Sequence, residues 1–254
     1  MSEQNIFDNQ NFFDGYRELR NQDTCMNDLL EQPAMEKMLP DLKGKTILDI
    51  GCGYGHNCFD FIKRGAKKVI GIDISEKMLD VAKKESANPD IEYRQMNMDE
   101  ISSLNTKFDL VYSSLAIHYA EDFKKLMRDI FGLLNNNGIL LYSQEHPIMT
   151  ATIDENMRHF NFDENGNRVS FTFSDYNRSG VRKAHWFGEE LIKYHRPMGE
   201  ILTEIAHSGF VITDVVEPLP EPWAVEKSPD VVREYIKSNF LIIKAVKNNT
   251  MIKE

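Results

Sequence analysis

The sequence predicts an α/β protein built on a doubly wound, mostly parallel sheet of seven strands. Two observations carry this prediction. Apolar segments of strand length alternate with amphipathic segments of helical period, and the first apolar segment runs into a loop with closely spaced glycines. Strand–helix–strand repeats fold with parallel strands and right-handed crossovers. We expect an N-terminal helical segment and an aromatic-rich insertion after the fifth strand to flank this sheet.

The composition is that of an acidic globular protein. The chain has 254 residues, 41% hydrophobic and 28% charged, with a formal net charge of −10. This length suits one α/β domain with insertions. The negative charge disfavours nucleic acid as a partner, because phosphate binding needs a positive surface. The N-terminus has no apolar signal core and no apolar run approaches a membrane span, so we expect a soluble, cytoplasmic monomer or homodimer that does not bind membranes.

Residues 1–40 form the expected N-terminal helical segment. Its apolar residues cluster at one end, in helical turns that we expect to break near Pro33 and to end at Pro40. The three cysteines of the chain form neither a zinc spacing nor a disulfide framework, which suits a reducing compartment.

Residues 41–147 form the expected cofactor-binding core. A helix is expected over His56–Arg64, stopped by Gly65, and Ser75 is the expected N-cap of the next helix. A helical stripe of apolar residues over 123–134 stops at an Asn-rich turn. The strands of this core are expected at Thr46–Ile50, Lys68–Ile72, Ile91–Gln95, Phe108–Ser113 and Ile139–Ser143.

Residues 148–190 interrupt this rhythm with many aromatic side chains. Val169–Ser174 alternates with period two, and the Asn165-Gly166 pair before it is a hairpin signal. We expect an insertion or cap over the acceptor site, at the carboxyl edge of the sheet. Residues 191–254 complete the core with a helix near Met198–His207, a strand at Phe210–Val216, a Pro-rich loop over 218–229 and a strand at Phe240–Val246.

The loop that follows the first strand has the pattern Asp49-x-Gly51-x-Gly53-x-Gly55. Glycines permit positive φ angles and let a ligand approach the bare backbone. In open α/β sheets, ligands bind outside the carboxyl ends of the strands. Asp73 ends the second strand, where an acidic side chain can accept both hydroxyls of a ribose. The loop and Asp73 together predict a site for an adenosyl ligand.

Two ligands compete for this loop. Loops that bind dinucleotides have the pattern G-x-G-x-x-G and hold a pyrophosphate at the helix N-terminus. Here the third glycine comes one residue early. The carboxylate of Asp49 would repel a pyrophosphate, whereas it suits a ligand that carries an ammonium group. S-adenosylmethionine has an ammonium group and no phosphate, so the loop favours it over NAD.

Four segments in succession resemble the signature segments of class I S-adenosylmethionine-dependent methyltransferases, whose fold is Rossmann-like. They are Asp49–Gly55, Val69–Ser75, Asn97–Asp99 and Phe108–Ser113, and the resemblance covers roughly residues 40–145. The segments have the order and spacing of that family, and as a set they are highly specific.

The resemblance implies a cofactor contact for each of these positions. The loop with Gly51, Cys52, Gly53 and Gly55 would lie against the methionine part, and Asp73 would hold the ribose hydroxyls. Further implied contacts are Ile74 and Met78 on the adenine, Asn97, Met98 and Asp99 at the adenine edge, and Ser113 and Ser114 near the methionine tail and methyl group. Tyr16, Arg20 and Asn27 resemble a segment that folds over the cofactor in a sub-branch of small-molecule methyltransferases.

Methyl transfer is an in-line displacement at a carbon that the sulfonium already activates. The enzyme therefore supplies mainly positioning and, for a hydroxyl or amine acceptor, a base. No metal is needed, and the sequence shows no convincing metal cluster. The candidate catalytic bases are His118, His146 and His195, each with the alternative of a hydrogen-bonded structural residue or a surface residue. The candidate substrate-binding residues are Tyr119, Glu145, Tyr194 and Arg196, of which Arg196 either grips a substrate carboxylate or pairs with a surface acid.

The sequence thus favours a methyltransferase that acts on an oxygen or nitrogen of a small molecule. A catalytically silent S-adenosylmethionine-binding protein is one alternative, and an NAD-dependent oxidoreductase is another that the loop pattern disfavours. Methylation of RNA or protein is disfavoured by the acidic charge and by the lack of a separate binding domain.

Overall fold

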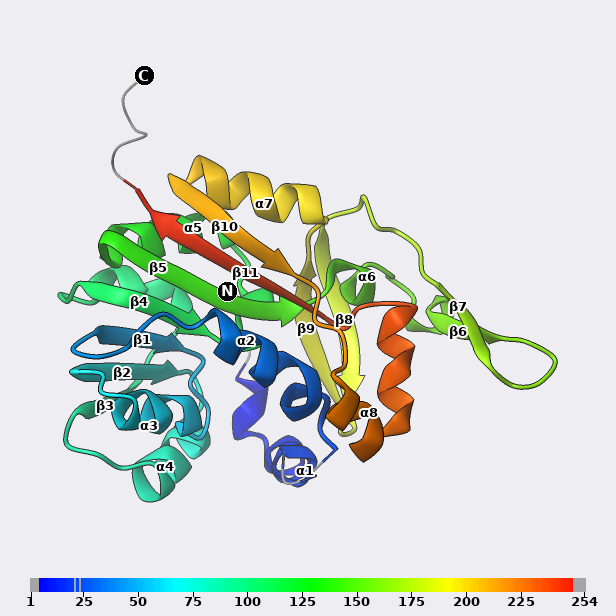
Figure 1. Ribbon diagram of the computed structural model, residues 1–254, viewed down its shortest axis with the longest axis horizontal. Helices are drawn as coiled ribbons and strands as arrows, with labels where there is room; N and C mark the ends of the chain where they lie inside the picture. The colour runs from blue at the N-terminus through cyan, green and yellow to red at the C-terminus, as the bar shows by residue number, and fades with distance from the viewer. Residues whose placement is uncertain (1–4, 21, 23, 249–254) are drawn as a thin grey trace.

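The computed structural model describes residues 5–20, 22 and 24–248 (Figure 1). Seven strands form one sheet in the order β10-β11-β5-β4-β1-β2-β3. Only β11 runs antiparallel to its neighbours, β5 and β10. This confirms the predicted doubly wound, mostly parallel sheet. The strands are β1 Thr46–Ile50, β2 Lys68–Asp73, β3 Ile91–Gln95, β4 Phe108–Ser113, β5 Leu134–Glu145, β10 Phe210–Val216 and β11 Phe240–Lys247.

Helices cover both faces of the sheet, because successive apolar residues of a strand point to opposite faces. In β1, Leu48 packs in the cluster that includes α5 and α7, whereas Ile47 packs in the cluster that includes α2 and α3. Ser75 caps α4 as predicted, since its Oγ accepts a hydrogen bond of 3.1 Å from the backbone N–H of Met78. The helices are α1 Gln10–Arg20, α2 Gln32–Met38, α3 His56–Lys63, α4 Glu76–Glu85, α5 Phe123–Leu133, α6 Pro147–Thr150, α7 Met198–His207 and α8 Pro222–Lys227.

Two prolines begin helices where the sequence pattern predicted a break or a loop. Pro33 lies in the first turn of α2 and does not interrupt the helical run, which starts with a π-helical turn, η2 (Asn27–Glu31). Pro222 likewise begins α8 inside the segment that was expected to be a loop. Pro222 is the first residue of α8 and loses no hydrogen bond, because the N–H that it lacks has no partner there.

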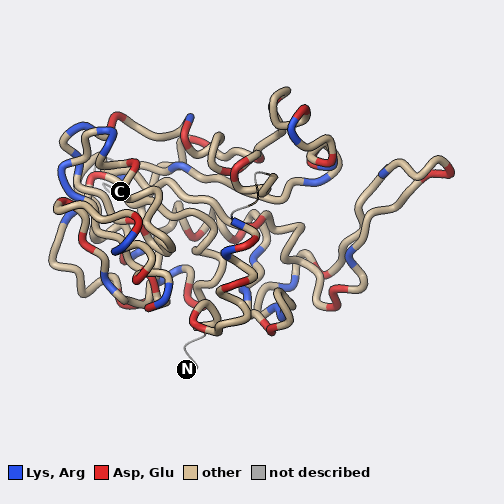
Figure 2. The backbone as a smooth tube through the Cα atoms, turned by 90° about the horizontal axis from the view of Figure 1, so that it is seen from below, with Lys and Arg blue, Asp and Glu red and all other residues tan. Residues whose placement is uncertain are grey.

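Two hairpins lie mostly within residues 148–190, and they occupy different positions in the fold. The first, β6 (His159–Phe162) and β7 (Arg168–Thr172), projects away from the sheet (Figures 1 and 2). The second, β8 (Gly180–Trp186) and β9 (Glu189–His195), packs against the short helix η4 (Ile117–Tyr119) beyond β4. The expected cover of the carboxyl edge is therefore made by β8 and β9, and the aromatic strand at Val169 belongs to the projecting hairpin.

None of the helices in the described part of the chain is both long and apolar enough to cross a membrane.

Candidate active site

A cavity of about 890 Å³ lies at the carboxyl ends of β1, β2 and β4. The loops after these strands form one side of it, and the β8–β9 hairpin contributes Trp186, Ile192 and Tyr194. The strand order reverses between β1 and β4, so this is the place where a doubly wound sheet binds its ligands.

Most of the predicted site residues meet at this cavity. Those expected to bind cofactor that line it are Tyr16, Arg20, Asn27, Gly51, Cys52, Gly53, Asp73, Ile74, Met78, Asn97, Met98, Asp99 and Ser114. Those expected on the acceptor side that line it are His118, Tyr119, Glu145 and Tyr194.

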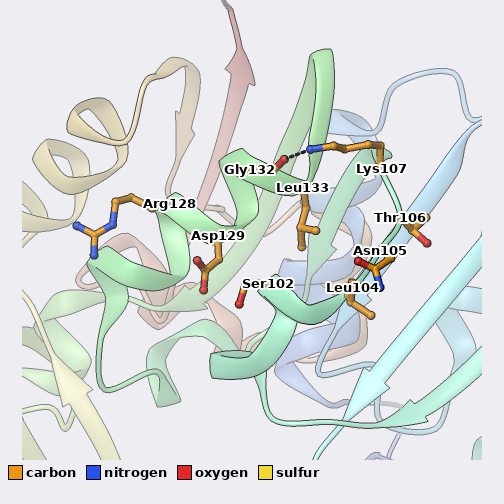
Figure 3. A pocket seen from close by; sticks show the side chains of 9 residues that line it. All are labelled: Ser102, Leu104, Asn105, Thr106, Lys107, Arg128, Asp129, Gly132 and Leu133. Atoms are coloured by element: carbon orange, nitrogen blue, oxygen red, sulfur yellow. Dashed lines mark hydrogen bonds between the residues drawn. The ribbon is translucent and has the colours of Figure 1, made fainter.

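A smaller depression of about 440 Å³ lies beside the amino ends of β4 and β5 (Figure 3). It is therefore at the other end of the strands from the large cavity. Its wall includes Lys107, whose Nζ donates a hydrogen bond to the carbonyl oxygen of Gly132. None of the predicted site residues lines this depression.

The three glycines of the loop have different roles, although all three have positive φ angles, 71° at Gly51, 51° at Gly53 and 75° at Gly55. A Cβ on Gly51 would lie 2.4 Å from the Cβ of Ala116, and one on Gly55 would lie 2.2 Å from the hydroxyl of Tyr93. A Cβ on Gly53 would meet no atom within 4 Å. Gly51 and Gly55 are therefore required for packing. Gly55 is the N-cap of α3 and lies outside the cavity lining. Gly53 lines the cavity and leaves it open, because it has no side chain.

Asp73 presents its carboxylate at the end of β2. Its Oδ2 accepts a hydrogen bond of 2.9 Å from the N–H of Gly53, and its Oδ1 accepts one of 2.9 Å from the N–H of Ser75. Burial raises the pKa of Asp73 above its usual value, and the two backbone donors oppose that rise. Each carboxylate oxygen still has acceptor capacity for a ligand hydroxyl.

We expect Asp73→Ala to weaken the binding of S-adenosylhomocysteine by on the order of 1.5–3 kcal/mol, or about 10- to 150-fold, through the loss of charge-assisted hydrogen bonds. Isothermal titration calorimetry measures this difference directly. Asp80→Ala is the matched control, because Asp80 is an exposed carboxylate on α4 outside the cavity. Equal affinity of Asp73→Ala and the wild-type protein would contradict the ribose contact.

Asp49 and Ser113 lie behind the loop and not on the cavity wall. Asp49 is 1% exposed and accepts a hydrogen bond of 3.2 Å from Sγ of Cys58, and burial raises its pKa to about 7. Ser113 donates a hydrogen bond of 2.8 Å to the carbonyl oxygen of Ile50. Both side chains support the loop from inside the fold, and the structure does not place them in cofactor contact.

His146 and His195 also lie outside the cavity lining, and both of their ring nitrogens are engaged. In His195, Nε2 lies 2.8 Å from the carbonyl oxygen of Tyr176, so it carries the hydrogen, and Nδ1 accepts from Thr150 Oγ1 at 2.9 Å. In His146, Nε2 lies 2.6 Å from Oε1 of Glu217, and Nδ1 accepts the N–H of Ile148 as the N-cap of α6. These contacts favour a structural role for both histidines over the role of candidate base.

Arg196 does not line the cavity, but it supports the wall by hydrogen bonds to residues that do. Its Nη2 donates hydrogen bonds of 2.7 and 2.6 Å to the carbonyl oxygens of Ala120 and Glu121, both of which do line the cavity. Among the described residues, Arg196 forms no ion pair within 4.0 Å, and its Nη2 donates to backbone carbonyl oxygens instead. A contact with a substrate carboxylate stays a prediction.

His118 is the one predicted base on the cavity wall. It is 4% exposed, and its Nδ1 has no hydrogen-bond partner among the described residues. Burial lowers its pKa to about 4, so the imidazole is neutral near pH 7. A neutral imidazole has one nitrogen that accepts a hydrogen bond or a proton. His118 therefore lines the cavity and keeps a ring nitrogen without a partner among the described residues.

Glu145 lies at the end of β5 and pairs with Lys193 of β9, with 2.6 Å between Oε1 and Nζ. Burial alone would raise the pKa of Glu145, but the ammonium of Lys193 holds it below its usual value. Glu145 therefore presents to the cavity an ionised carboxylate whose negative charge is balanced by Lys193.

The cavity also contains residues that sequence reasoning missed. They come from segments far apart in the chain, and the structure adds Phe7, Tyr54, Met149, Trp186, Ile192, Asn239 and Phe240. Trp186 is in ring contact with Tyr16, with 6.4 Å between the ring centroids, so the N-terminal segment and the β8–β9 hairpin meet over the cavity. The aromatic content of both segments was visible in the sequence, but their contact was not.

Among the described residues, no three His, Cys, Asp or Glu side chains come together as a metal site.

Comparison with known proteins places this geometry in one family. Residues 48–142 match the family described as a methyltransferase domain. A crystal structure of an S-adenosylmethionine-dependent methyltransferase from Mesorhizobium loti is 35% identical, with a TM-score of 0.78 over 85% of this chain and 97% of that one. An uncharacterised protein of Haemophilus influenzae is 34% identical over 84% of this chain and 86% of its own length. Demethylmenaquinone methyltransferase of Lactococcus lactis is 33% identical over 48% of this chain and 51% of its own length.

Proposed function

This chain belongs to the family of S-adenosylmethionine-dependent methyltransferases, and on that premise we propose that it methylates an oxygen or nitrogen atom of a small molecule. Membership of the family decides against an NAD-dependent oxidoreductase. The observation that carries the proposal is the single cavity that joins the glycine loop to His118 and the β8–β9 hairpin.

The chain's own residues fit S-adenosylmethionine in this cavity. The bare backbone at Gly53 would adjoin the methionine part, Asp73 would accept the ribose hydroxyls, and Ile74 and Met78 would pack on the adenine. Acidic residues dominate the charged lining, which suits a cofactor that carries a sulfonium and an ammonium group. When bound, the cofactor supplies a methyl carbon activated for displacement.

The remaining wall suits a small, partly apolar acceptor. The whole cavity, of about 890 Å³, falls within the range of about 300–1,000 Å³ that is typical of small-molecule sites, and the cofactor would occupy part of it. Tyr119, Trp186 and Ile192 supply apolar surface, while Glu145 and Tyr194 supply polar contacts. The formal net charge of −10 supports a small molecule over RNA as the acceptor.

His118 is the residue that we assign as the base. As the acceptor atom forms its bond to carbon it becomes strongly acidic, so even an imidazole with a pKa of about 4 accepts its proton. Burial keeps the imidazole unprotonated in the resting enzyme. Positioning of the acceptor against the methyl donor supplies the larger part of the rate enhancement.

Incubation of a metabolite extract with the protein and methyl-labelled S-adenosylmethionine tests this function. We expect label in a small product that mass spectrometry finds one methylene unit heavier than its precursor. Label that appears only in protein or RNA, or no transfer above a heat-inactivated control, would overturn the proposal.

A further inference from the structure

Glu31 is a carboxylate that the proposed reaction does not use, and it is 0% exposed. It ends the π-helical turn η2, and its side chain reaches the carboxyl ends of β4 and β5. Its Oε1 accepts hydrogen bonds from the hydroxyls of Ser114, at 2.9 Å, and Ser143, and its Oε2 accepts one of 2.8 Å from Nε2 of Gln32. One side chain thus ties the N-terminal segment to two central strands.

Neutral groups alone hydrogen bond to this carboxylate. Among the described residues, none of the ion pairs within 4.0 Å includes Glu31. Burial raises the pKa of Glu31, and the two serines, Gln32 and the positive charge of Arg20 oppose that rise. A buried carboxylate without a cation in direct contact is costly for folding. Its presence therefore calls for a role other than stability.

Two of its partners, Gln32 and Ser114, line the cavity, whereas Glu31 itself does not. Nε2 of Gln32 also lies 3.0 Å from Oγ of Ser114, so the two cavity-lining groups are linked to each other as well as to Glu31. The N–H of Leu115 donates a hydrogen bond of 3.0 Å to Oγ of Ser143, and Leu115 has a φ of +53°. The carboxylate cluster therefore holds the turn after β4 in a conformation that leucine rarely adopts.

The N-terminal segment, here called the cover (residues 5–20 and 24–38), is attached by a carboxylate to the N-terminus of α4 at its start and to the sheet near its end. At its start, Oδ1 of Asp8 accepts hydrogen bonds from Oγ of Ser75 at 2.6 Å and from the N–H of Lys77 at 3.1 Å. Glu31 is the attachment near its other end. Between the two, α1 carries Tyr16 and Arg20 to the cavity wall.

We propose that Glu31 is a positioning residue that closes the cover over the cofactor and orients Ser114 and Gln32 at the cavity wall. The charge of Glu31 gives these three hydrogen bonds their strength, since bonds to an ionised acceptor are about twice as strong as neutral ones. The inference rests on cofactor binding, which the family shares, and not on the identity of the acceptor.

Glu31→Gln tests this inference, because it keeps the size of the side chain and removes its charge. The matched control is Glu36→Gln, an exposed carboxylate on α2 that pairs with Arg64. We expect Glu31→Gln to bind S-adenosylhomocysteine about 10-fold or more weakly in calorimetry. In the wild-type protein and the control, saturating S-adenosylhomocysteine should protect the cover from trypsin at Arg17 and Arg20. In Glu31→Gln this protection should be lost.

A purely structural Glu31 gives a different result. The melting temperature of Glu31→Gln would then fall equally with and without ligand, while its affinity and its protection from trypsin matched the wild-type protein, and this would overturn the inference. Ser143→Ala removes one donor and leaves the charge in place, and it should weaken binding in the same direction even if Glu31→Gln does not fold. Wild-type affinity in Ser143→Ala, or no binding by the wild-type protein, would also overturn it. Failure of the acceptor screen alone leaves these binding results unaffected.

Discussion

We expect Gly53→Val to bind no S-adenosylhomocysteine at concentrations that saturate the wild-type protein. Gly53 has a φ of +51°, and its Cβ direction leads into free space within the cavity lining. A valine there would fill the space in which the cofactor approaches the backbone. It would also cost on the order of 1–3 kcal/mol, because a β-branched residue is strained in the left-handed region. Calorimetry of the purified variant measures the loss.

Gly44→Val separates the two effects. Gly44 has a φ of +72°, and a Cβ on it also meets no atom within 4 Å, but it lies in the turn before β1 and outside the cavity lining. The control therefore has a similar backbone strain and an unobstructed cavity. It should melt at a lower temperature and still bind S-adenosylhomocysteine. Binding by Gly53→Val as tight as that of Gly44→Val would show that the ligand does not approach the loop at Gly53.

We expect His118→Ala to lower kcat by about 10²- to 10⁴-fold, the usual contribution of a positioned general base, once the acceptor is known. The affinity for S-adenosylhomocysteine should remain close to that of the wild-type protein. Because burial sets the pKa of His118 to about 4, the imidazole is protonated and inactive below that pH and neutral above it. The rate should therefore show no loss from this group between pH 5 and pH 8.

His207→Ala is the control for this prediction, since His207 is an exposed residue in the last turn of α7. It should leave kcat unchanged. A value of kcat in His118→Ala within a factor of about 3 of the wild type would mean that the acceptor loses its proton to water or to another group, because that factor is far below the effect of a general base.

The geometry of the candidate cofactor site could be predicted because its signals are local. The loop at Gly51 and Gly53 needs positive φ angles, and Asp73 ends the neighbouring strand, so short stretches of sequence specify both positions. Pairing of β1 with β2 in parallel then brings them together, with Asp73 accepting the N–H of Gly53.

The acceptor half could be predicted only in part, because a strand end does not reveal which neighbour faces the cavity. Side chains alternate along a strand, so Tyr194 of β9 lines the cavity while the next residue, His195, is buried behind it. In the same way Glu145 lines the cavity, and His146 turns away to cap α6. Each polar cluster has a member that lines the cavity, but the members that face it could not be distinguished by spacing alone from those that face away.

Contacts between distant segments were beyond sequence reasoning. Glu31 lies in a segment whose pattern predicted only helical turns, and its proposed role depends on Ser143, more than a hundred positions later in the chain. Trp186 belongs to a region that was expected as a whole to cover the site, but only the second hairpin does so. Strand pairing does not separate the projecting hairpin from the covering one, because both are antiparallel pairs of neighbouring strands.

A crystal structure of the protein with S-adenosylhomocysteine tests the central claim most directly, namely that this cavity is where the cofactor meets the acceptor. The account predicts the ribose hydroxyls on Asp73, the homocysteine part along Gly51–Gly53, and the sulfur turned toward the part of the cavity that contains His118 and Trp186. Ligand bound outside this cavity, or bound with its ribose away from Asp73 and its sulfur turned away from His118, would contradict it.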